Sequence, residues 1–213
     1  MTAIVRPDIE AYAQDHSAPP PPHLVALAQE TRDALSAPGM MVGALEGRFL
    51  EMLVFSLKAR RVLEIGTFSG YSALSMAAGM APEGRIITCE ISDVHAEVAR
   101  RHIAASPYSE MIEVRVGPAM DTVRLLEGQF DFVFIDADKG SYLDYYESVL
   151  PKLADGGLVA IDNTLWSGAV LDDPEGSADT IAIRTFNDHL VADRRVSCVQ
   201  LTVRDGVTLV RRN

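Results

Sequence analysis

Three oxygen-bearing side chains and one lysine stand out in the middle of this 213-residue sequence. Asp136 follows one short apolar run, and Asp162 and Asn163 follow another. Two carboxylates and an amide oxygen, without histidine or cysteine, suit Mg²⁺ or Ca²⁺ better than zinc. Lys139 is one of only three lysines in the chain, and beside a bound cation it can lose its proton and act as a general base. The set predicts a metal site with a base beside it; the alternative is that the acids cap the following helices.

A glycine-containing segment, Glu64–Gly70, indicates a second binding function. Gly66 and Gly70 let the backbone approach a ligand closely, and the amides that open the next helix can hold a carboxylate. The segment is not GxGxxG, and Glu64 would repel a pyrophosphate, so a zwitterionic amino acid suits it better. Glu90 lies 20 residues after Gly70, a spacing at which a carboxylate binds the hydroxyls of an adenosine ribose. The alternatives are a tight turn and a solvated acid at a strand end.

The elements that must position these residues alternate between short β-branched runs and helix-length segments. The predicted strands are 61–66, 85–90, 112–117, 130–136 and 157–162, and the predicted helices are 70–80, 94–105, 119–127, 141–153 and 178–192. This alternation predicts an α/β fold with a parallel sheet, because parallel neighbours need long crossover connections. Ligands of such sheets bind beyond the carboxyl ends of the strands, so the polar residues named above are expected along one edge.

The two ends of the chain depart from this alternation. Residues 196–203 and 207–211 are strand-like, and the Asp-Gly pair in Arg204-Asp205-Gly206 predicts a hairpin because both residues tolerate positive φ. The four prolines at 19–22 cannot lie inside a helix and separate a leader, 1–22, from N-terminal helices within 23–60. Helical apolar spacing covers 23–35 and 44–57, and the second of these presents Leu45, Phe49, Met52, Leu53 and Ser56. With residues 61–213 as the α/β core, we expect one domain over 1–213.

Composition narrows the possible partners. A formal net charge of −11, from 19 basic and 30 acidic residues, argues against binding to nucleic acid. Two cysteines, Cys89 and Cys198, are too few for a disulfide scaffold and fit a reduced, cytoplasmic setting. No apolar run approaches the roughly 20 residues of a membrane span, and the first residues lack a secretory signal. The five histidines show no ligand spacing and are predicted to be surface or structural residues.

Three motifs together resemble those of a known family. Val62-Leu-Glu-Ile-Gly-Thr-Phe-Ser-Gly-Tyr-Ser-Ala-Leu74, Phe134-Ile-Asp-Ala-Asp-Lys139 and Asp162-Asn-Thr-Leu-Trp166 are similar to signatures of the cation-dependent class I S-adenosylmethionine O-methyltransferases, the family of caffeoyl-CoA and catechol O-methyltransferases. The resemblance runs from about Met40 to the closing hairpin. It implies a Rossmann-like methyltransferase fold with a seven-stranded, mostly parallel sheet, an antiparallel C-terminal hairpin and extra N-terminal helices.

The resemblance also implies roles for individual residues. S-adenosylmethionine would be held by Val42, Glu64, Gly66, Thr67, Ser72, Glu90, Ala119 and Asp138, with Glu90 on the ribose. Asp136, Asp162 and Asn163 would bind the divalent cation, for which Mg²⁺ is expected, and Lys139 would be the base. Met40, Trp166 and Ser167 would border the acceptor. The resemblance further implies a homodimer that uses the N-terminal helices and the final hairpin, for which exposed apolar residues on those helices would be supporting evidence.

The expected reaction is methylation of one hydroxyl of a small aromatic acceptor with two vicinal hydroxyls. A coenzyme A ester is a less suitable acceptor, because Arg32 is the only cation in the region Pro19–Met41. Three alternatives stay open: a non-catechol phenol as acceptor, a non-catalytic S-adenosylmethionine-binding or dimerisation protein, and an NAD-linked oxidoreductase. The last lacks GxGxxG and leaves the two aspartates and the asparagine without a role.

Overall fold

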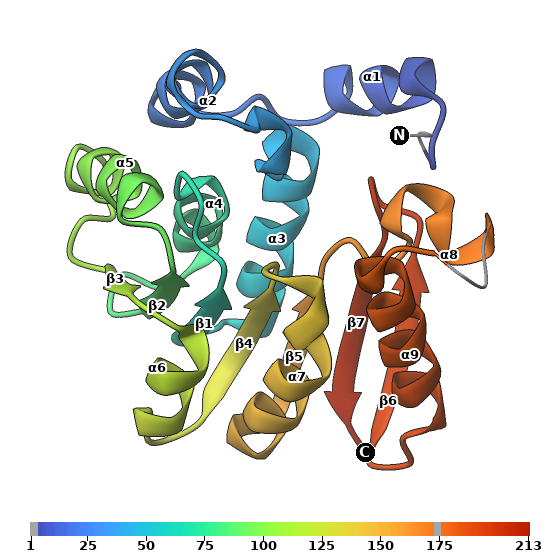
Figure 1. The fold of residues 1–213 in the computed structure, drawn as a ribbon. Helices are drawn as coiled ribbons and strands as arrows, with labels where there is room; N and C mark the ends of the chain where they lie inside the picture. Colours follow the sequence, from blue (N-terminus) through green and yellow to red (C-terminus); the bar gives the residue numbers. More distant parts are fainter. Residues whose placement is uncertain (1–3, 173–175) are drawn as a thin grey trace.

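The architecture is a seven-stranded sheet with helices on both faces, seen in a computed structural model that describes residues 4–172 and 176–213 (Figure 1). The first three residues of the predicted leader lie outside the described residues. The strands are β1 (Arg61–Ile65), β2 (Arg85–Glu90), β3 (Ile112–Val116), β4 (Phe130–Ile135), β5 (Leu153–Ile161), β6 (Val196–Leu201) and β7 (Val207–Arg212). Their order across the sheet is β3-β2-β1-β4-β5-β7-β6.

The predicted parallel sheet and the antiparallel last strand are both confirmed. Strands β1 to β5 pair in parallel, whereas β7 pairs antiparallel with both β5 and β6. Strand order reverses at β1, which lies between β2 and β4. This is the switch point beside which α/β sheets bind their ligands.

The helices form two layers around the sheet. Their bounds are α1 (Pro7–Asp15), α2 (Pro22–Ala34), α3 (Gly43–Leu57), α4 (Tyr71–Gly79), α5 (Asp93–Ala104), α6 (Ala119–Leu125), α7 (Tyr142–Val149), α8 (Ala169–Asp172) and α9 (Ala178–Ala192), with 3₁₀ turns η1 (Pro38–Met40), η2 (Lys139–Ser141), η3 (Leu150–Lys152) and η4 (Trp166–Gly168). Residues of β1 alternate between the layers: Val62 packs with the α2–α5 layer, and Leu63 packs with the layer of α6, α7 and α9.

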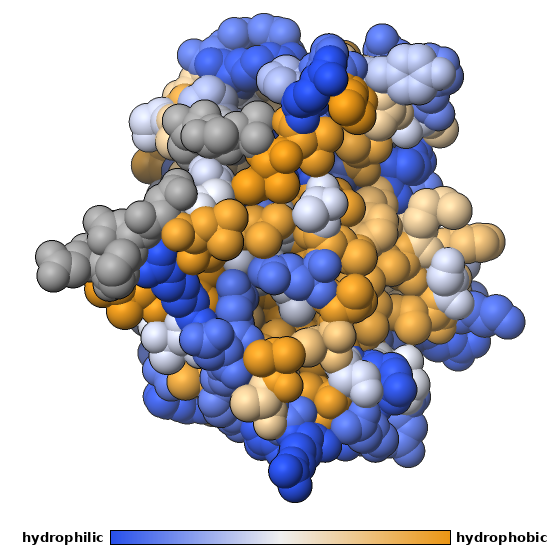
Figure 2. Space-filling model, turned by 90° about the vertical axis from the view of Figure 1, so that its right-hand side faces the viewer, coloured by the Kyte–Doolittle hydropathy of each residue, from blue (hydrophilic) through white to orange (hydrophobic). Residues whose placement is uncertain are grey.

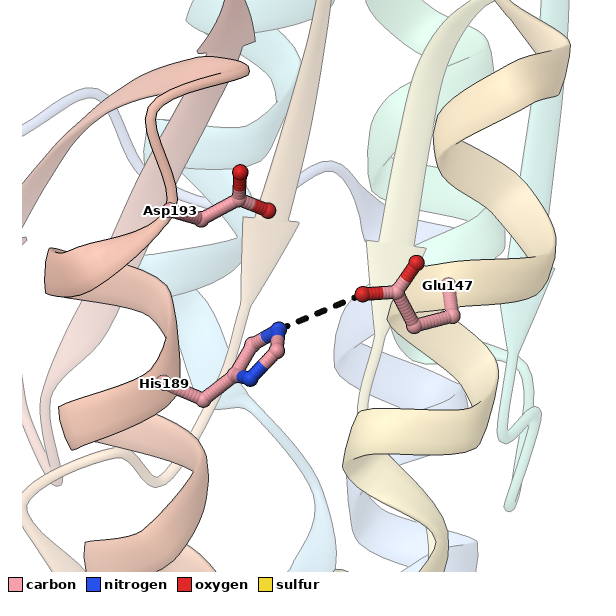
Figure 3. A group of neighbouring side chains, drawn as sticks. All are labelled: Glu147, His189 and Asp193. Atoms are coloured by element: carbon pink, nitrogen blue, oxygen red, sulfur yellow. Dashed lines mark hydrogen bonds and ion pairs between the residues drawn. The ribbon is translucent and has the colours of Figure 1, made fainter.

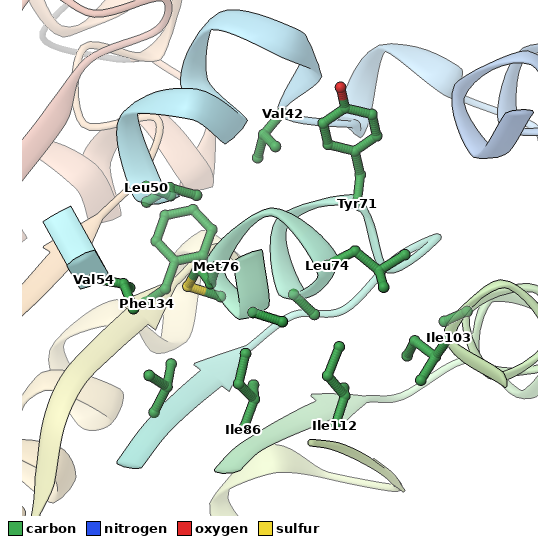
Figure 4. Close-up of a cluster of buried hydrophobic side chains, with 14 of the residues drawn as sticks. Val42, Leu50, Val54, Tyr71, Leu74, Met76, Ile86, Ile103, Ile112 and Phe134 are labelled. Carbon is green, nitrogen blue, oxygen red and sulfur yellow. The ribbon is translucent and has the colours of Figure 1, made fainter. Parts of the chain in front are cut away.

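Figure 4 shows the packing of the α2–α5 layer against the strands. Leu50 and Val54 of α3 meet Met76 of α4 over the strands, and all three side chains are fully buried. Two glycines bring the helices close together: a Cβ on Gly47 would lie 2.7 Å from Ser75 Oγ, and one on Gly79 would lie 2.4 Å from the Glu51 carbonyl oxygen. These two close approaches fix α3 firmly against α4.

The structure differs from the sequence prediction at the two ends of the chain, on α3 and at β5, which begins at Leu153 where the end of a helix was predicted. The leader contains a helix, α1, with no buried residue, and α2 begins at Pro22, which the first turn tolerates because its N–H would have no helical partner. On α3 the buried stripe is Glu46, Gly47, Leu50 and Val54, so the predicted apolar face is only half-buried and Met52 is 54% exposed. Positive φ in the hairpin falls on Arg204 and Gly206 instead of Asp205, and β6 ends at Leu201, so residues 202 and 203 belong to the turn.

Candidate active site

One cavity of about 1120 Å³ lies at the carboxyl edge of the parallel strands. Fourteen of the fifteen predicted site residues line it: Met40, Val42, Gly66, Thr67, Ser72, Glu90, Ala119, Asp136, Asp138, Lys139, Asp162, Asn163, Trp166 and Ser167. They come from the carboxyl ends of β1 to β5, from the loops and helix starts that follow these strands, from the segment around η1 and from η4. The remaining one, Glu64, lies in β1 and does not line this cavity.

The predicted metal ligands lie side by side because their strands pair. Ile135 at the end of β4 is in register with Ile161 at the end of β5, so Asp136 and Asp162 begin neighbouring loops. Asn163 follows with a φ of 58°, and its backbone N–H donates to Asp162 Oδ1 at 2.7 Å. Burial and the Asp136 carboxylate raise the pKa of Asp162 to about 7. Two crowded carboxylates with an amide oxygen are a donor set that fits a hard divalent cation, whose charge would stabilise both acids.

Lys139 lies among these oxygens. Its Nζ is 3.1 Å from Asp136 Oδ1 and 2.6 Å from Asn163 Oδ1. Tyr142, which is fully buried, holds the same Nζ at 2.6 Å through its hydroxyl and donates to the Asp162 carbonyl oxygen at 3.0 Å. The lysine is only 8% exposed, so its amine is fixed at the cavity wall instead of extending into solvent.

The loop after β1 takes a conformation that only glycine allows. Gly66 has a φ of 99°, and a Cβ there would lie 1.8 Å from the carbonyl oxygen of Asp136. This close approach joins the glycine loop to the loop that carries Asp136, a predicted metal ligand. The N–H of Phe68 donates to Glu90 Oε2 at 2.7 Å and the N–H of Ser92 to Glu90 Oε1 at 2.9 Å, so the Glu90 carboxylate is fixed at the end of β2.

Glu64 is completely buried behind this loop. Its Oε2 accepts a hydrogen bond from the Thr88 hydroxyl, and Thr88 in turn contacts the Thr67 hydroxyl on the cavity wall. Burial raises the pKa of Glu64 to about 8. Its carboxyl group is therefore uncharged over much of the neutral range until a cationic partner approaches.

The sequence prediction missed several residues that line the cavity. Glu46 is 1% exposed, its Oε1 has no hydrogen-bond partner among the described residues, and burial together with the Asp162 carboxylate raises its pKa well above the usual range. Arg204 donates to the Met41 carbonyl oxygen at 3.1 Å and lies 3.5 Å from Glu46 Oε2. His95 stacks edge-on against Phe68 and lies 3.5 Å from Glu90. Glu46 has helical spacing with the buried Leu50 and Val54. An acid on this apolar face was the sequence signal that could have identified it.

The residues predicted to border the acceptor lie in short 3₁₀ turns. The Trp166 ring lies 5.6 Å from Lys139 Nζ, and the N–H of Ser167 donates to the Asp205 carboxylate of the hairpin. Met40 lies in η1 and is 53% exposed. These three residues, predicted to border the acceptor, are thus brought to the same cavity as the base.

A second group of titratable side chains lies away from this cavity. Figure 3 shows Glu147, His189 and Asp193 pointing toward one another, with His189 Nε2 3.2 Å from Glu147 Oε1. Arg195 already bridges the two acids, with its Nη2 at 2.6 Å from Glu147 Oε1 and 2.7 Å from Asp193 Oδ2. The group is an ion-pair network that joins α7 to the end of α9, in keeping with a structural role for His189.

Among the described residues, no helix combines the length and the apolar character needed to cross a membrane.

Sequence comparison places the chain in a family. A profile of the O-methyltransferase family matches residues 14–213. A probable caffeoyl-CoA O-methyltransferase of Dictyostelium discoideum is 36% identical over 206 residues, covering 93% of this chain and 89% of that protein. The catechol O-methyltransferase of Mycobacterium tuberculosis is 38% identical over 179 residues, covering 84% of this chain and 80% of that protein.

Solved structures agree with this assignment. The O-methyltransferase of Bacillus cereus, solved with S-adenosylhomocysteine, superposes with a TM-score of 0.89 at 32% identity over 97% of both chains. A second solved structure is an O-methyltransferase of Streptomyces achromogenes involved in tomaymycin synthesis, in complex with S-adenosylmethionine. It superposes with a TM-score of 0.82 at 30% identity over 96% of both chains. By sequence and by fold, this chain belongs to the O-methyltransferase family, the S-adenosylmethionine-dependent enzymes that include the caffeoyl-CoA and catechol O-methyltransferases.

Proposed function

We propose that this enzyme transfers the methyl group of S-adenosylmethionine to one hydroxyl of a small free catechol, with a divalent cation, Mg²⁺ in the first instance, at Asp136, Asp162 and Asn163. The observation that carries the proposal is the position of Lys139, whose amine lies 3.1 Å from Asp136 Oδ1 and 2.6 Å from Asn163 Oδ1. A base so close to two of the three oxygen donors suits an acceptor with two adjacent hydroxyls, one of which must lose a proton.

The residues of the chain would divide the work as follows. Lys139, as the neutral amine, takes the proton from one acceptor hydroxyl, while Tyr142 keeps its Nζ in place. The acceptor oxygen then attacks the methyl carbon, and the carbon–sulfur bond breaks with its electron pair going to sulfur, which leaves S-adenosylhomocysteine. Glu90 and the Gly66 loop hold the methyl donor in the same cavity. When bound, the cation lowers the pKa of the hydroxyl and fixes its orientation. Most of the rate enhancement then comes from orientation and electrostatics.

The charge around the acceptor end favours a small acceptor over a coenzyme A ester. The side chains that line it include Glu10, Asp179 and Asp205, with Arg204 as the cation on that side. Coenzyme A carries several phosphate charges, which these acids would repel. A neutral catechol would not meet this repulsion.

The acceptor class can be tested by mass spectrometry of the products formed with S-adenosylmethionine and Mg²⁺. The proposal predicts mono-methylation of catechol and of caffeic acid, and little or no reaction with phenol or with guaiacol, whose second hydroxyl is already methylated. If phenol is methylated as fast as catechol, the acceptor class is phenols in general and the catechol assignment is wrong. Caffeoyl-CoA methylated faster than the free acids would overturn the preference for a small acceptor.

We also propose a cytoplasmic homodimer. Its support is apolar surface on the elements expected to meet: Met52 and Phe55 on α3 are 54% and 66% exposed, and Val199 on β6 is 50% exposed. Figure 2 shows hydrophobic residues gathered across the middle of the face that includes α1 and β6. Light scattering after gel filtration should give twice the 23.1 kDa chain mass. Phe55→Glu should shift the protein toward that chain mass, and a monomeric wild type would contradict the proposal.

A further inference from the structure

A second, smaller cavity of about 280 Å³ lies under α1, between this helix, α3 and the turn that joins β6 to β7. Its walls are mostly apolar: Val5, Ile9, Ala13, Leu45, Phe49 and Val203, with Glu10, Thr202 and Arg204 as the polar members. Three residues, Val5, Glu10 and Arg204, line both this cavity and the large one. The two cavities therefore adjoin at these three residues.

The packing of α1 explains why this space exists. No residue of α1 is buried, and Ile9, which faces the cavity, is still 51% exposed. The helix rests over α3 without filling the gap beneath it. An apolar cavity offers few hydrogen-bond partners to water, and cavities of about 150 Å³ are already large enough to bind benzene. A volume of about 280 Å³ can hold a second aromatic ring or a short alkyl chain.

Arg204 stands at the junction of the two cavities. Its guanidinium is held by the Met41 carbonyl oxygen at 3.1 Å, by Glu46 Oε2 at 3.5 Å and by Glu10 Oε1 at 3.9 Å. The polar end of the side chain is thus engaged on three sides, and a planar guanidinium offers a flat face against which an apolar or aromatic group can pass. The positive φ of Arg204, 46°, directs the side chain here from the hairpin turn.

We infer that the small cavity binds an apolar substituent of the acceptor, an alkyl chain or a second ring attached to the catechol. This inference rests on the proposed function, because the catechol hydroxyls at Lys139 fix one end of the acceptor. A substituent on the far side of the ring is then directed past Arg204 toward Phe49 and Val203. The cavity selects acceptors by the apolar area that they bury, and it takes no part in the methyl transfer itself.

The test is equilibrium binding of an acceptor series: catechol, 4-methylcatechol, 4-propylcatechol and 4-hexylcatechol. Binding is measured by calorimetry with S-adenosylhomocysteine and Mg²⁺ present, so that no turnover is needed. Each buried methylene should lower Kd by up to about fourfold until the cavity is full. In a parallel turnover assay the longer acceptors should have lower KM at similar kcat, because the added contact is the same in the ground state and the transition state.

Two matched variants locate the effect. Ala13→Phe places a ring in the small cavity, whereas Ala11→Phe adds the same ring on an α1 residue that lines neither cavity. Ala13→Phe should abolish the dependence of Kd on chain length while leaving the Kd of unsubstituted catechol unchanged, and Ala11→Phe should behave as wild type. An equal Kd for all four acceptors in the wild type would overturn the inference, as would a chain-length dependence that persists in Ala13→Phe.

The two proposals fail in different ways. A chain-length dependence of Kd without any methylated product would leave the apolar cavity in place and overturn the proposed reaction. Methylation of all acceptors with an unchanging Kd would overturn the inference about the small cavity and leave the proposed reaction in place. A flat series together with a smaller assembly mass for Ala13→Phe would show that a second copy of the chain, and no part of the acceptor, occupies the cavity.

Discussion

Lys139 Nζ lies 2.6 Å from Asn163 Oδ1, an oxygen that the proposed cation would also need. The ammonium group of a protonated lysine and a divalent cation compete for such an oxygen, because both are attracted by its lone pairs and partial negative charge. Loss of the proton from Lys139 removes this competition and prepares the amine as a base. The contact therefore links the proposed base to the proposed metal site.

The first prediction concerns Lys139→Met. Removal of the base should lower kcat by about 10²- to 10⁴-fold. Mg²⁺ affinity, measured by calorimetry with S-adenosylhomocysteine bound, should stay the same or increase, because the competing positive charge is gone. Lys152→Met serves as the control, since this lysine donates to the Leu126 carbonyl oxygen and does not line the cavity. Weaker Mg²⁺ binding in Lys139→Met would show that the lysine supports the metal site and does not compete with it.

The second prediction concerns Glu64 and pH. Its pKa is raised from 4.5 to about 8 by burial, so the folded chain holds a proton that the unfolded chain releases between these two values. The stability that this provides is fully present below pH 4.5 and is lost as the pH rises to about 8. The slope from this group is at most about 1.4 kcal/mol per pH unit in the ligand-free protein.

Urea unfolding of the ligand-free protein from pH 5 to 8 measures this dependence. Glu64→Gln should flatten the decline of the unfolding free energy, because the amide does not titrate. Glu97→Gln, which alters an exposed acid on α5, should leave the slope as in wild type. Identical slopes for all three proteins would mean that Glu64 is ionised in the folded state.

The third prediction concerns Gly66→Ala. A Cβ here would meet the Asp136 carbonyl oxygen at 1.8 Å, in a backbone conformation with a φ of 99°. We expect a loss of about 3 kcal/mol or more in unfolding free energy, because the β1 and β4 loops must separate. Gly39→Ala, with open space around its Cβ position, should change stability by no more than about 0.5 kcal/mol. A Gly66→Ala protein as stable as wild type would show that the two loops can part without cost.

The sequence predicted the central part of the site well for physical reasons. The strands alternate with helices, so their carboxyl ends must share an edge, and Asp136, Asp162 and Glu90 therefore converge. Local sequence predicted less where tertiary contacts determine which side chains of a helix are buried. The close packing of Gly47 on α4 turned Glu46 inward and left Met52 outside, against the apolar periodicity of the helix.

The hairpin and the leader illustrate the same limit. Asp-Gly is a strong turn signal, yet the positive φ falls on Arg204, whose side chain is held by Glu46 and the Met41 carbonyl oxygen. The helix α1 buries no residue, so it takes no part in the apolar pattern of the core. Neither the small cavity nor the junction at Arg204 was therefore visible before the fold was known.

The most direct measurement of the central claim is methyl transfer to catechol by wild type and Asp162→Ala, each with Mg²⁺ and with EDTA, followed by mass spectrometry. Asp162 is buried with its pKa raised to about 7, so the alanine variant should fold and, without metal, be at least as stable as wild type. The account predicts a methylated product only for the wild type with Mg²⁺. Equal product from the wild type in EDTA, or from a folded Asp162→Ala protein, would contradict the assignment of Asp136, Asp162 and Asn163 as a catalytic metal site.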